Sequence, residues 1–343
     1  MTNADDAFAA SLQESRVIGT EVAEQPQRLA VDQTKPVVVT GAAGLVGTEV
    51  CRTLVREGWK VRAVVRDAPK ALARFGHLPV ELRVADIRNP DSMRAALTDA
   101  GSLIHLAAIA IERPGQTYAD VNTGATRILL DAASATGVDR IVYMSQNGAD
   151  GKSRYAFLRS KGVAEDMVTS SSTHWTVHRP SVIFGPDDEF VNVLARMIRL
   201  SPVIFPLPGG GKARFQPVAV ADVAGAVVKS LGQPSAIRTS YSLGGQAPLD
   251  LRQMTERILI AMGTSRKLVS APVAVIRPLV AAAQKLLPKP PVTTGLLELL
   301  EIDNVIPHND LPELGISPIP FAPEELLYLR NITAGSAFKS LFG

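Results

Sequence analysis

The chain has 343 residues, of which 46% are hydrophobic and 20% charged, with a net charge of +3. This ordinary composition predicts a globular protein that buries a sizeable core. Because the basic residues are dispersed and not interleaved with aromatic ones, we expect no nucleic-acid partner. One cysteine, Cys51, excludes an internal disulfide bond, and we expect it to be a buried apolar residue of the first helix. We see no secretory signal and no apolar stretch of about 18 residues, and therefore predict a cytoplasmic protein.

Residues 1–35 carry no strand pattern and are predicted to be a tail that is disordered or docks on a partner. Beyond them, short apolar runs alternate with helical periods. Strands are predicted at 37–40, 60–66, 80–84, 102–106, 140–145 and 173–178, and long helices at 118–136 and 155–170.

This alternation predicts an α/β fold with a doubly wound parallel sheet, the Rossmann arrangement, over residues 36–185. Glycine and proline then break the rhythm. Late pieces of the main sheet are expected within 215–245, and residues 186–343 are predicted to form a smaller, helix-rich α/β lobe for a substrate or a partner.

A glycine-rich loop, Thr40–Gly47, follows the first predicted strand and opens a predicted helix. In the pattern TGxxGxxG the first glycine allows the tight turn, the second lets the backbone approach a pyrophosphate, and the third lets the helix lie close to the strand. The helix N-terminus then offers N–H groups to the phosphates. The residues assigned to this cofactor loop are Gly41, Ala43, Gly44, Leu45, Val46 and Gly47.

The second predicted strand ends in Arg66, with Asp67 directly after it. An arginine at this position accommodates the 2′-phosphate of NADP, whereas an acidic residue binds the ribose hydroxyls of NAD. We favour NADP(H) over NAD(H), and the alternative through Asp67 stays open.

Two further motifs, Asp86-Ile87 after the third strand and His105-Leu106-Ala107-Ala108 after the fourth, accompany the glycine loop. Together these motifs resemble the extended and atypical short-chain dehydrogenase/reductase superfamily, which includes the NAD-dependent epimerases and dehydratases. The resemblance implies that the Asp86 carboxylate contacts the adenine amino group, beside Ile87, and that Ala107 and Ala108 line the nicotinamide side. From the residues alone, Asp86 is equally well placed to cap a helix.

Residues 179–186, the run Gly209–Lys212 and residues 215–218 resemble one branch of that superfamily, which contains the NAD(P)H-binding accessory subunit of respiratory complex I and its bacterial relatives. This resemblance adds Pro180 and Ile183 to the cofactor site. It also implies a membrane-associated, complex I-like partner, with the protein peripheral at the inner face of the membrane.

Reductases of the superfamily use a Tyr-x-x-x-Lys pair, in which the lysine binds the nicotinamide ribose and the tyrosine transfers a proton. Lys161 fits the lysine, but the residue four positions earlier is Phe157. Tyr155 lies about 200° around the helix from Phe157 and substitutes only if the helix begins later. The catalytic Ser or Thr after the fifth strand corresponds to Ser145 or to Asn147. Lys161, Tyr155 and Ser145 are therefore the catalytic candidates, and these departures weaken catalysis without touching cofactor binding.

The C-terminal region contains an apolar helix at 272–287, which Pro278 is expected to kink or split, and a second helix at 294–300. Four roles stay open for 272–300: the lobe's own core, a lid over an apolar substrate, a partner-docking surface, and a peripheral membrane contact. We predict no metal site, because the histidines are scattered, and we expect His105 and His178 to be packed rather than catalytic.

Two functions compete. In the first, the cofactor is a structural or redox-sensing element and the protein is an accessory subunit of a respiratory NADH:quinone oxidoreductase. In the second, the protein is an NADP-dependent reductase or an epimerase/dehydratase-like enzyme. That enzyme would act on a quinone-like, isoprenoid-like or sugar-nucleotide substrate.

Overall fold

The computed structural model describes residues 31–286 and 292–342, and the first 30 residues of the predicted tail lie outside them. The last five residues of that predicted tail are ordered. They form a turn closed by a hydrogen bond from the Lys35 amide to the Asp32 carbonyl, and Val31 packs against the main core.

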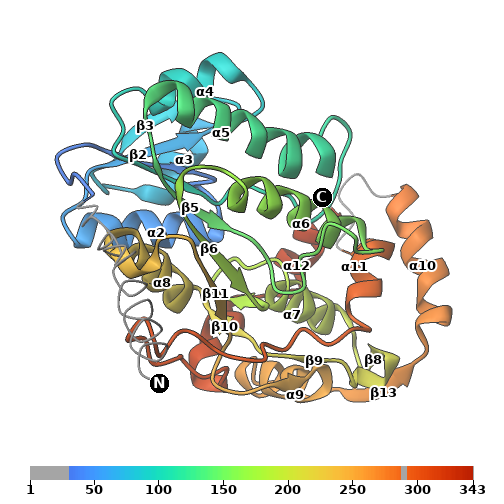
Figure 1. Ribbon diagram of the computed structural model, residues 1–343. Coiled ribbons are helices and arrows are strands. Elements are labelled where there is room, and N and C mark those ends of the chain that lie inside the picture. The colour runs from blue at the N-terminus through green and yellow to red at the C-terminus, as the bar shows by residue number, and fades with distance from the viewer. Residues whose placement is uncertain (1–30, 287–291, 343) are drawn as a thin grey trace, which may run out of the picture. The chain divides into compact units, whose positions relative to one another are not determined.

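Seven parallel strands form the main sheet in the order β11-β6-β5-β4-β1-β2-β3 (Figure 1). Their bounds are β1 Val37–Thr40, β2 Val61–Val65, β3 Glu81–Val84, β4 Ser102–His105, β5 Arg140–Met144, β6 His174–Pro180 and β11 Thr239–Leu243. The predicted doubly wound parallel sheet is confirmed. The strand order reverses between β1 and β4, and in open α/β sheets a ligand binds in the crevice at this reversal.

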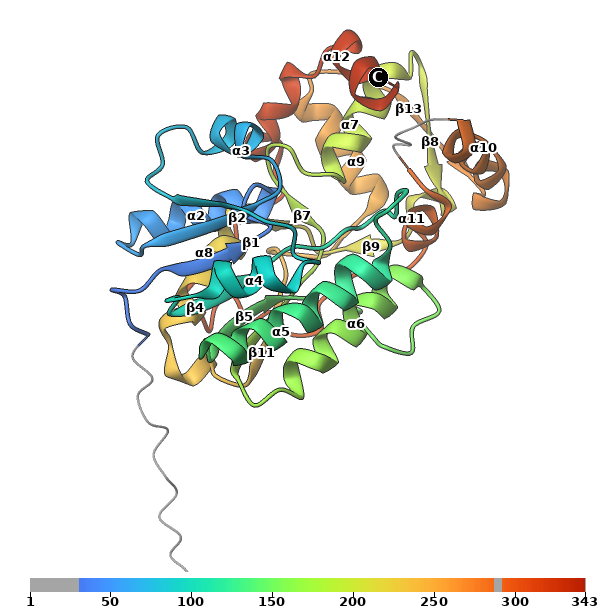
Figure 2. The ribbon, with the colours of Figure 1, turned by 90° about the horizontal axis from the view of Figure 1, so that it is seen from above.

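Helices cover both faces of this sheet, so that its central strands are buried on both sides. The helices α2 (Leu45–Arg56), α3 (Ala68–Phe75) and α8 (Val220–Gly232) share one core cluster on one face. The helices α4 (Pro90–Leu97), α5 (Ala125–Thr136) and α6 (Ala156–Thr169) lie on the other (Figure 2). Successive residues of β1 divide between the two cores: Val39 faces the first and Val38 the second.

The helix predicted at 118–136 consists of two parts. A π-helical segment, η1 (Ala119–Gly124), precedes α5. The side chain of Asn122 in this segment bonds the Ile109 backbone at both its amide and its carbonyl, and it donates to Ser160 Oγ. Irregular turns of this kind occur frequently at functional sites, and here η1 joins the loop after β4 to α6.

The second lobe packs around its own core, which includes Phe184, Phe205, Phe215 and Phe321. Its elements are β7 (Ile183–Phe184), α7 (Val191–Leu200), β8 (Ile204–Pro208), η2 (Gly209–Gly211), β9 (Arg214–Phe215), β10 (Val218–Ala219), β12 (Leu249–Asp250), α9 (Leu251–Ala261), β13 (Lys267–Ala271), α10 (Val273–Leu286), α11 (Thr294–Leu299), η4 (Pro323–Asn331) and α12 (Ala334–Phe342). The short η3 (Pro234–Ala236) lies between α8 and β11 and packs in the main core. We expected Pro278 to kink or split α10; it lies inside a continuous α10, so the helix is not split there.

Candidate functional site

The glycine loop lies at the reversal of strand order, between β1 and α2. Gly41 has a φ of +69°, and a Cβ on it would stand 2.8 Å from the Ala107 nitrogen of the neighbouring loop. A Cβ on Gly47 would stand 2.1 Å from the Gly41 carbonyl oxygen. Both positions therefore require glycine, for the turn and for the close approach of α2 to the loop.

The first turn of α2 has backbone N–H groups without an internal acceptor. The N-cap residue, Gly44, has no side chain that could accept a hydrogen bond from these groups. The first turn, which begins with Leu45 and Val46, contains no acidic residue. A helix N-terminus with these features binds an anion through its N–H groups and its dipole. Together with the two obligatory glycines, it fits the pyrophosphate of a dinucleotide.

Two residues at the end of β2 take different roles. Asp67 caps α3, because its side chain accepts a hydrogen bond of 3.0 Å from the Lys70 amide. Arg66 is exposed and has no ion pair or hydrogen bond within the described part of the chain. Asp67, the residue that would favour NAD, is thus engaged in capping α3, whereas Arg66, the residue that would favour NADP, has no ion pair among the described residues.

Asp86 follows β3 and is paired with Arg88, whose guanidinium lies 2.6 Å from the carboxylate. Hydrogen bonds from Arg88 hold the pKa of Asp86 below its usual range. The alternative interpretation of Asp86 as a helix cap is wrong, because Asn89 caps α4 by accepting from the Ser92 amide. Asp86 and Arg88 border a pocket of about 550 Å³ between the start of α4 and η1, and Ile87 is buried beside it.

The loop after β4 forms the opposite wall of the crevice. Ala107 abuts Gly41, while Ala108 is exposed. His105 at the end of β4 is fully packed: its ring nitrogens contact the hydroxyls of Thr40 at 2.7 Å and Thr126 at 3.1 Å. Burial lowers its pKa to about 3, so the ring stays neutral. The packed role expected for His105 is what the structure contains.

Lys161 is buried on α6 and faces β5. Its ammonium donates a hydrogen bond of 2.6 Å to the Met144 carbonyl and stands 4.6 Å from the centre of the Tyr143 ring. Burial lowers the pKa of Lys161 to about 7, against a smaller opposite effect of Glu165. Glu165 itself is paired with Arg179. The donor that resemblance assigns to the nicotinamide ribose is therefore bonded to the protein's own backbone.

The two aromatic residues before Lys161 are separated by the start of the helix. α6 begins at Ala156, so Tyr155 is an extended residue before the helix, and Arg154 bonds its hydroxyl. Phe157 lies inside α6 and packs against the ring of Tyr118, at a centroid distance of 6.0 Å. The Tyr118 hydroxyl donates to the Ala110 carbonyl. None of the recorded contacts of Tyr155 reaches Lys161.

The segment after β5 contains both candidates for the catalytic hydroxyl position. Ser145 is buried, and its hydroxyl has no hydrogen-bond partner among the described residues. The Asn147 side-chain amide donates to Asn304 Oδ1 at 2.7 Å and to the Val305 carbonyl at 3.3 Å. A C-terminal segment is thus tied into the site, and no sequence pattern could reveal this bond, because Asn147 and Asn304 are 157 positions apart.

Pro180 ends β6 and is buried, and Ile183 lies in β7 against the main core. The turn that follows β7 approaches the glycine loop: a Cβ on Gly185 would lie 3.8 Å from Leu45 Cδ1. Arg74, which the sequence analysis did not single out, also contacts the glycine loop. Arg74 of α3 donates to the Ala43 carbonyl at 3.1 Å and pairs with Asp187 at 3.1 Å.

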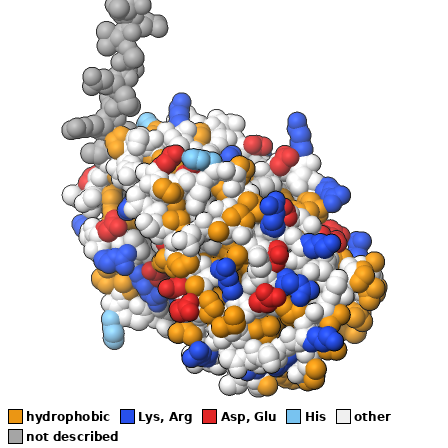
Figure 3. All heavy atoms as spheres, turned by 90° about the horizontal axis from the view of Figure 1, so that it is seen from below, with side chains coloured by type: hydrophobic (Ala, Val, Ile, Leu, Met, Phe, Trp, Pro, Cys, Tyr) orange, Lys and Arg blue, Asp and Glu red, His pale blue; other side chains and the backbone are white. Residues whose placement is uncertain are grey.

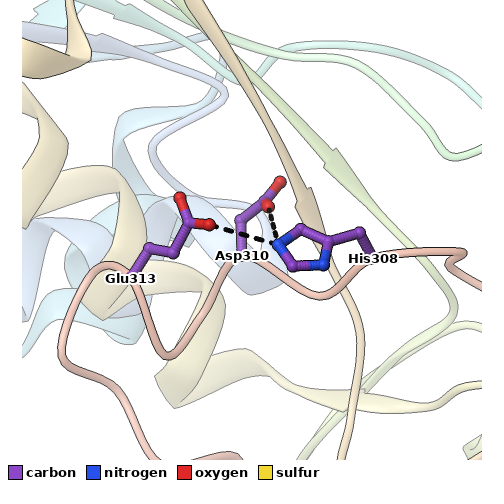
Figure 4. A group of neighbouring side chains, drawn as sticks. All are labelled: His308, Asp310 and Glu313. Atoms are coloured by element: carbon purple, nitrogen blue, oxygen red, sulfur yellow. Dashed lines mark hydrogen bonds and ion pairs between the residues drawn. The ribbon is translucent and has the colours of Figure 1, made fainter.

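A cluster of possible metal ligands lies apart from this crevice. His308 Nε2 stands 3.4 Å from Asp310 and 3.1 Å from Glu313 (Figure 4). The ligand atoms of these three lie within 4.8 Å of one another. We expected no metal site because the histidines are scattered along the sequence, but the fold brings His308 beside two carboxylates. His308 is exposed, and Asp310 also accepts from the Ser242 amide, so the group fastens its loop to β11.

The fold and the glycine loop define a Rossmann-type dinucleotide-binding protein. Residues 41–234 match the NAD(P)H-binding family, and the chain belongs to that family, within the atypical short-chain dehydrogenase/reductase superfamily. The mouse NADH dehydrogenase (ubiquinone) 1 alpha subcomplex subunit 9, mitochondrial, is 30% identical over 85% of this chain and 79% of its own length. Ceramide reductase of Caulobacter vibrioides is 30% identical over 51% of this chain and 55% of its own.

Solved structures show the same fold at lower identity. UDP-glucose 4-epimerase of Thermus thermophilus, solved in complex with NAD, is 20% identical, covers 88% of this chain and 98% of its own, and has a TM-score of 0.65. A nucleoside-diphosphate-sugar epimerase of Staphylococcus aureus is 17% identical, covers 86% and 100%, and has a TM-score of 0.68. The chain therefore binds a pyridine nucleotide on an epimerase-like fold.

Proposed function

We propose that this protein holds NADP(H) as a structural or redox-sensing group and does not turn over a substrate. The observation that carries this proposal is the position of Asn147. Its amide donors bond Asn304 and Val305 of the C-terminal segment, where a catalytic hydroxyl would face a substrate carbonyl. Phe157 stands in the place of the proton-donating tyrosine, and if Asn147 rather than Ser145 holds the position of the catalytic hydroxyl, a second group of the proton-transfer centre also lacks its function.

The state of Lys161 supports the same proposal. In catalysis, a lysine at this position binds the ribose and lowers the pKa of the tyrosine. Here its ammonium bonds the Met144 carbonyl, and no tyrosine stands four residues before it. The nucleotide supplies hydride chemistry when bound. Lys161 ties α6 to the end of β5, and Asn147 ties the segment after β5 to the C-terminal segment, at the end of the crevice where the nicotinamide would lie.

We further propose that the nucleotide is NADP(H) rather than NAD(H). Arg66 is an exposed, unpaired cation at the end of β2, and Asp67 is committed to capping α3. Arg66→Ala should weaken NADPH binding by about tenfold to a hundredfold, as expected for a lost charge-assisted hydrogen bond, and leave NADH binding unchanged. Arg83→Ala, which removes a cation that pairs with Glu81 on β3, is the matched control. Equal losses for both nucleotides would contradict the preference.

The setting we propose for this nucleotide is an accessory subunit of a membrane-associated, complex I-like assembly, at the inner face of the membrane. Support comes from similar proteins of mouse, Arabidopsis thaliana and Neurospora crassa, all of which are NADH dehydrogenase or NADH-ubiquinone oxidoreductase subunits. Affinity purification from the native host at mild detergent concentration tests this. Co-purification with subunits of a respiratory NADH:quinone oxidoreductase is expected, and recovery of the chain alone from solubilised membranes would contradict it.

A turnover assay tests the non-catalytic role. Purified protein is incubated with NADPH and a panel of quinones, long-chain ketones and nucleotide sugars, and nucleotide oxidation is followed at saturating substrate. We expect no rate above that of the Gly41→Ala variant, which lacks the nucleotide site. Robust turnover that Lys161→Ala abolishes would overturn the proposal.

The second candidate function is that of an NADP-dependent reductase or an epimerase/dehydratase-like enzyme, and the position at which α6 begins favours it. The helix begins at Ala156, so Tyr155 precedes it and its direction is not set by the helical geometry that would turn it away from Lys161. An enzyme that uses Tyr155 in place of the usual tyrosine requires this arrangement. In that case Tyr155→Phe should lower a measured rate by about a hundredfold, the usual contribution of a general acid. An unchanged rate would exclude Tyr155 as the acid.

A further inference from the structure

Charge is unevenly distributed along the second lobe. Between Glu256 and Glu298 the chain has six basic residues and no acidic one, although the whole chain carries a net charge of only +3. The six are Arg257, Arg266, Lys267, Arg277, Lys285 and Lys289, of which Lys289 lies outside the described residues. Arg277 pairs with Glu298 of α11 at 3.0 Å. Lys267 and Lys285 have no ion pair within residues 31–286 and 292–342.

The helix α10 within this stretch is apolar on two sides. Toward the protein it presents Val273, which is buried, and Ile276 and Val280, which are half-buried. Toward solvent it presents a second row with the spacing i, i+4, i+7 and i+11, which places its members on one helix face. This row consists of Val275, Leu279, Ala282 and Leu286, of which Val275 is 64%, Leu279 70% and Leu286 81% exposed.

The neighbouring strands continue this surface. β8 and β13 form a parallel pair in which Ile204 lies beside Lys267. Val203, Ile204 and Val269 are exposed, whereas Phe205 on the other side of β8 is buried in the lobe's core. Figures 1 and 2 place β8, β13 and α10 side by side at one end of the second lobe. Figure 3 shows apolar, basic and acidic side chains intermingled on the underside of the molecule.

We infer that this surface, the α10 face, docks on an anionic lipid bilayer. Exposed rows of large aliphatic side chains gain free energy by entering the boundary between headgroups and acyl chains. Lysine and arginine beside them gain about 1 kcal/mol each from anionic headgroups. Arg277 is neutralised by Glu298. Lys267 and Lys285, however, are exposed and have no ion pair within the described residues, and these two positive charges favour an anionic bilayer as the occupant. None of the helices in the described ranges is long and apolar enough to span a membrane, so the contact is peripheral.

This docking extends the proposed role at a membrane-associated assembly, but it does not require a bound nucleotide. The crevice lies at the β1–β4 reversal of the main sheet, and none of the residues assigned to it belongs to the α10 face. The two functions can therefore fail separately.

A vesicle flotation assay with the full chain tests this inference. Wild-type protein should float with vesicles that contain phosphatidylglycerol and phosphatidylcholine, and not with phosphatidylcholine alone. The double variant Leu279→Ser with Leu286→Ser should bind at least about tenfold more weakly, since each leucine contributes over 1 kcal/mol when it leaves water. Lys285→Gln, which removes one positive charge, should weaken binding about fivefold, and added salt should weaken it further.

The matched control is Leu72→Ser with Leu327→Ser, which changes two exposed leucines of α3 and η4 away from the α10 face. It should float like the wild type. Failure of the wild type to float with anionic vesicles, equal flotation with both vesicle types, or equal losses in both double variants would overturn the inference. NADPH stoichiometry measured on the same samples should stay unchanged in every variant, which separates this result from a failure of the nucleotide site.

Discussion

At the glycine-loop end of the site, backbone N–H groups of α2 are open and two glycines leave room beside them. At the β5–α6 end, two polar side chains bond to other groups of the protein, Asn147 to Asn304 and Lys161 to Met144, while the Ser145 hydroxyl has no partner among the described residues. The first end therefore has hydrogen-bond donors available for a ligand, whereas at the second end the donors of Asn147 and Lys161 are engaged within the protein. A Rossmann site can thus keep its dinucleotide and lose its proton transfer, because different elements build the two ends.

At the glycine-loop end, NADPH binding should be lost when a side chain fills the space that Gly41 leaves open. Gly41→Ala places a Cβ 2.8 Å from the Ala107 nitrogen, at a φ of +69°. NADPH affinity should fall by more than about a hundredfold, because strain and a displaced loop together cost at least about 3 kcal/mol. Fluorescence titration with NADPH measures this loss.

The control for this change is Gly58→Ala. Gly58 has a φ of +82° but nothing within 4 Å of the added Cβ. It should lose about 1 kcal/mol of stability and bind NADPH normally. If both variants bound NADPH alike, the loop would not be the nucleotide site.

The β5–α6 end should respond in stability and not in nucleotide affinity. Asn147→Ala removes the two bonds to the C-terminal segment and leaves the Val305 carbonyl without this partner. The free energy of unfolding should fall by about 1–3 kcal/mol, while NADPH affinity changes less than about twofold. Urea unfolding and NADPH titration on the same preparation provide both values. A large loss of affinity with unchanged stability would mean that Asn147 faces the nucleotide.

Lys161, at the β5–α6 end, should make a smaller contribution to stability, and one that depends on pH. Burial lowers its native pKa to about 7, from 10.5 in the unfolded chain. Between these values the unfolded chain binds more protons, so this group makes the free energy of unfolding rise with pH, by at most about 1.4 kcal/mol per pH unit.

Lys161→Met removes this titration and leaves the neighbouring Glu165 and Tyr143 in place. The stability of the wild type minus that of the variant should therefore increase from about pH 7 to pH 10. Urea unfolding at several pH values measures this difference. A flat difference would mean that Lys161 keeps its proton in the native state.

The same division separates what the sequence predicts from what it does not. The glycine loop, the parallel sheet and the burial of Cys51 and His105 follow from short-range patterns, and the structure contains them as predicted. The clamp of Asn147 on Asn304 and the contact of Arg74 with Ala43 join residues 157 and 31 positions apart. No local pattern encodes such contacts, because the first depends on how the C-terminal segment packs beside β5 and the second on how α3 packs beside the glycine loop.

Two local errors have a similar cause. The capping interpretation of Asp86 competed with Asn89 three residues later, and only the observed start of α4 at Pro90 decides between them. His308, Asp310 and Glu313 come together because a loop folds back on β11. Their spacing in the chain resembles no known metal motif.

The release rate of bound nucleotide tests the central claim most directly. Protein purified with its nucleotide is mixed with excess NADP⁺, and the fluorescence of bound NADPH is followed over time. A structural or sensing cofactor predicts stoichiometric NADPH that leaves over hours. Release within seconds would contradict the account, since a site that exchanges its nucleotide so quickly is suited to turnover.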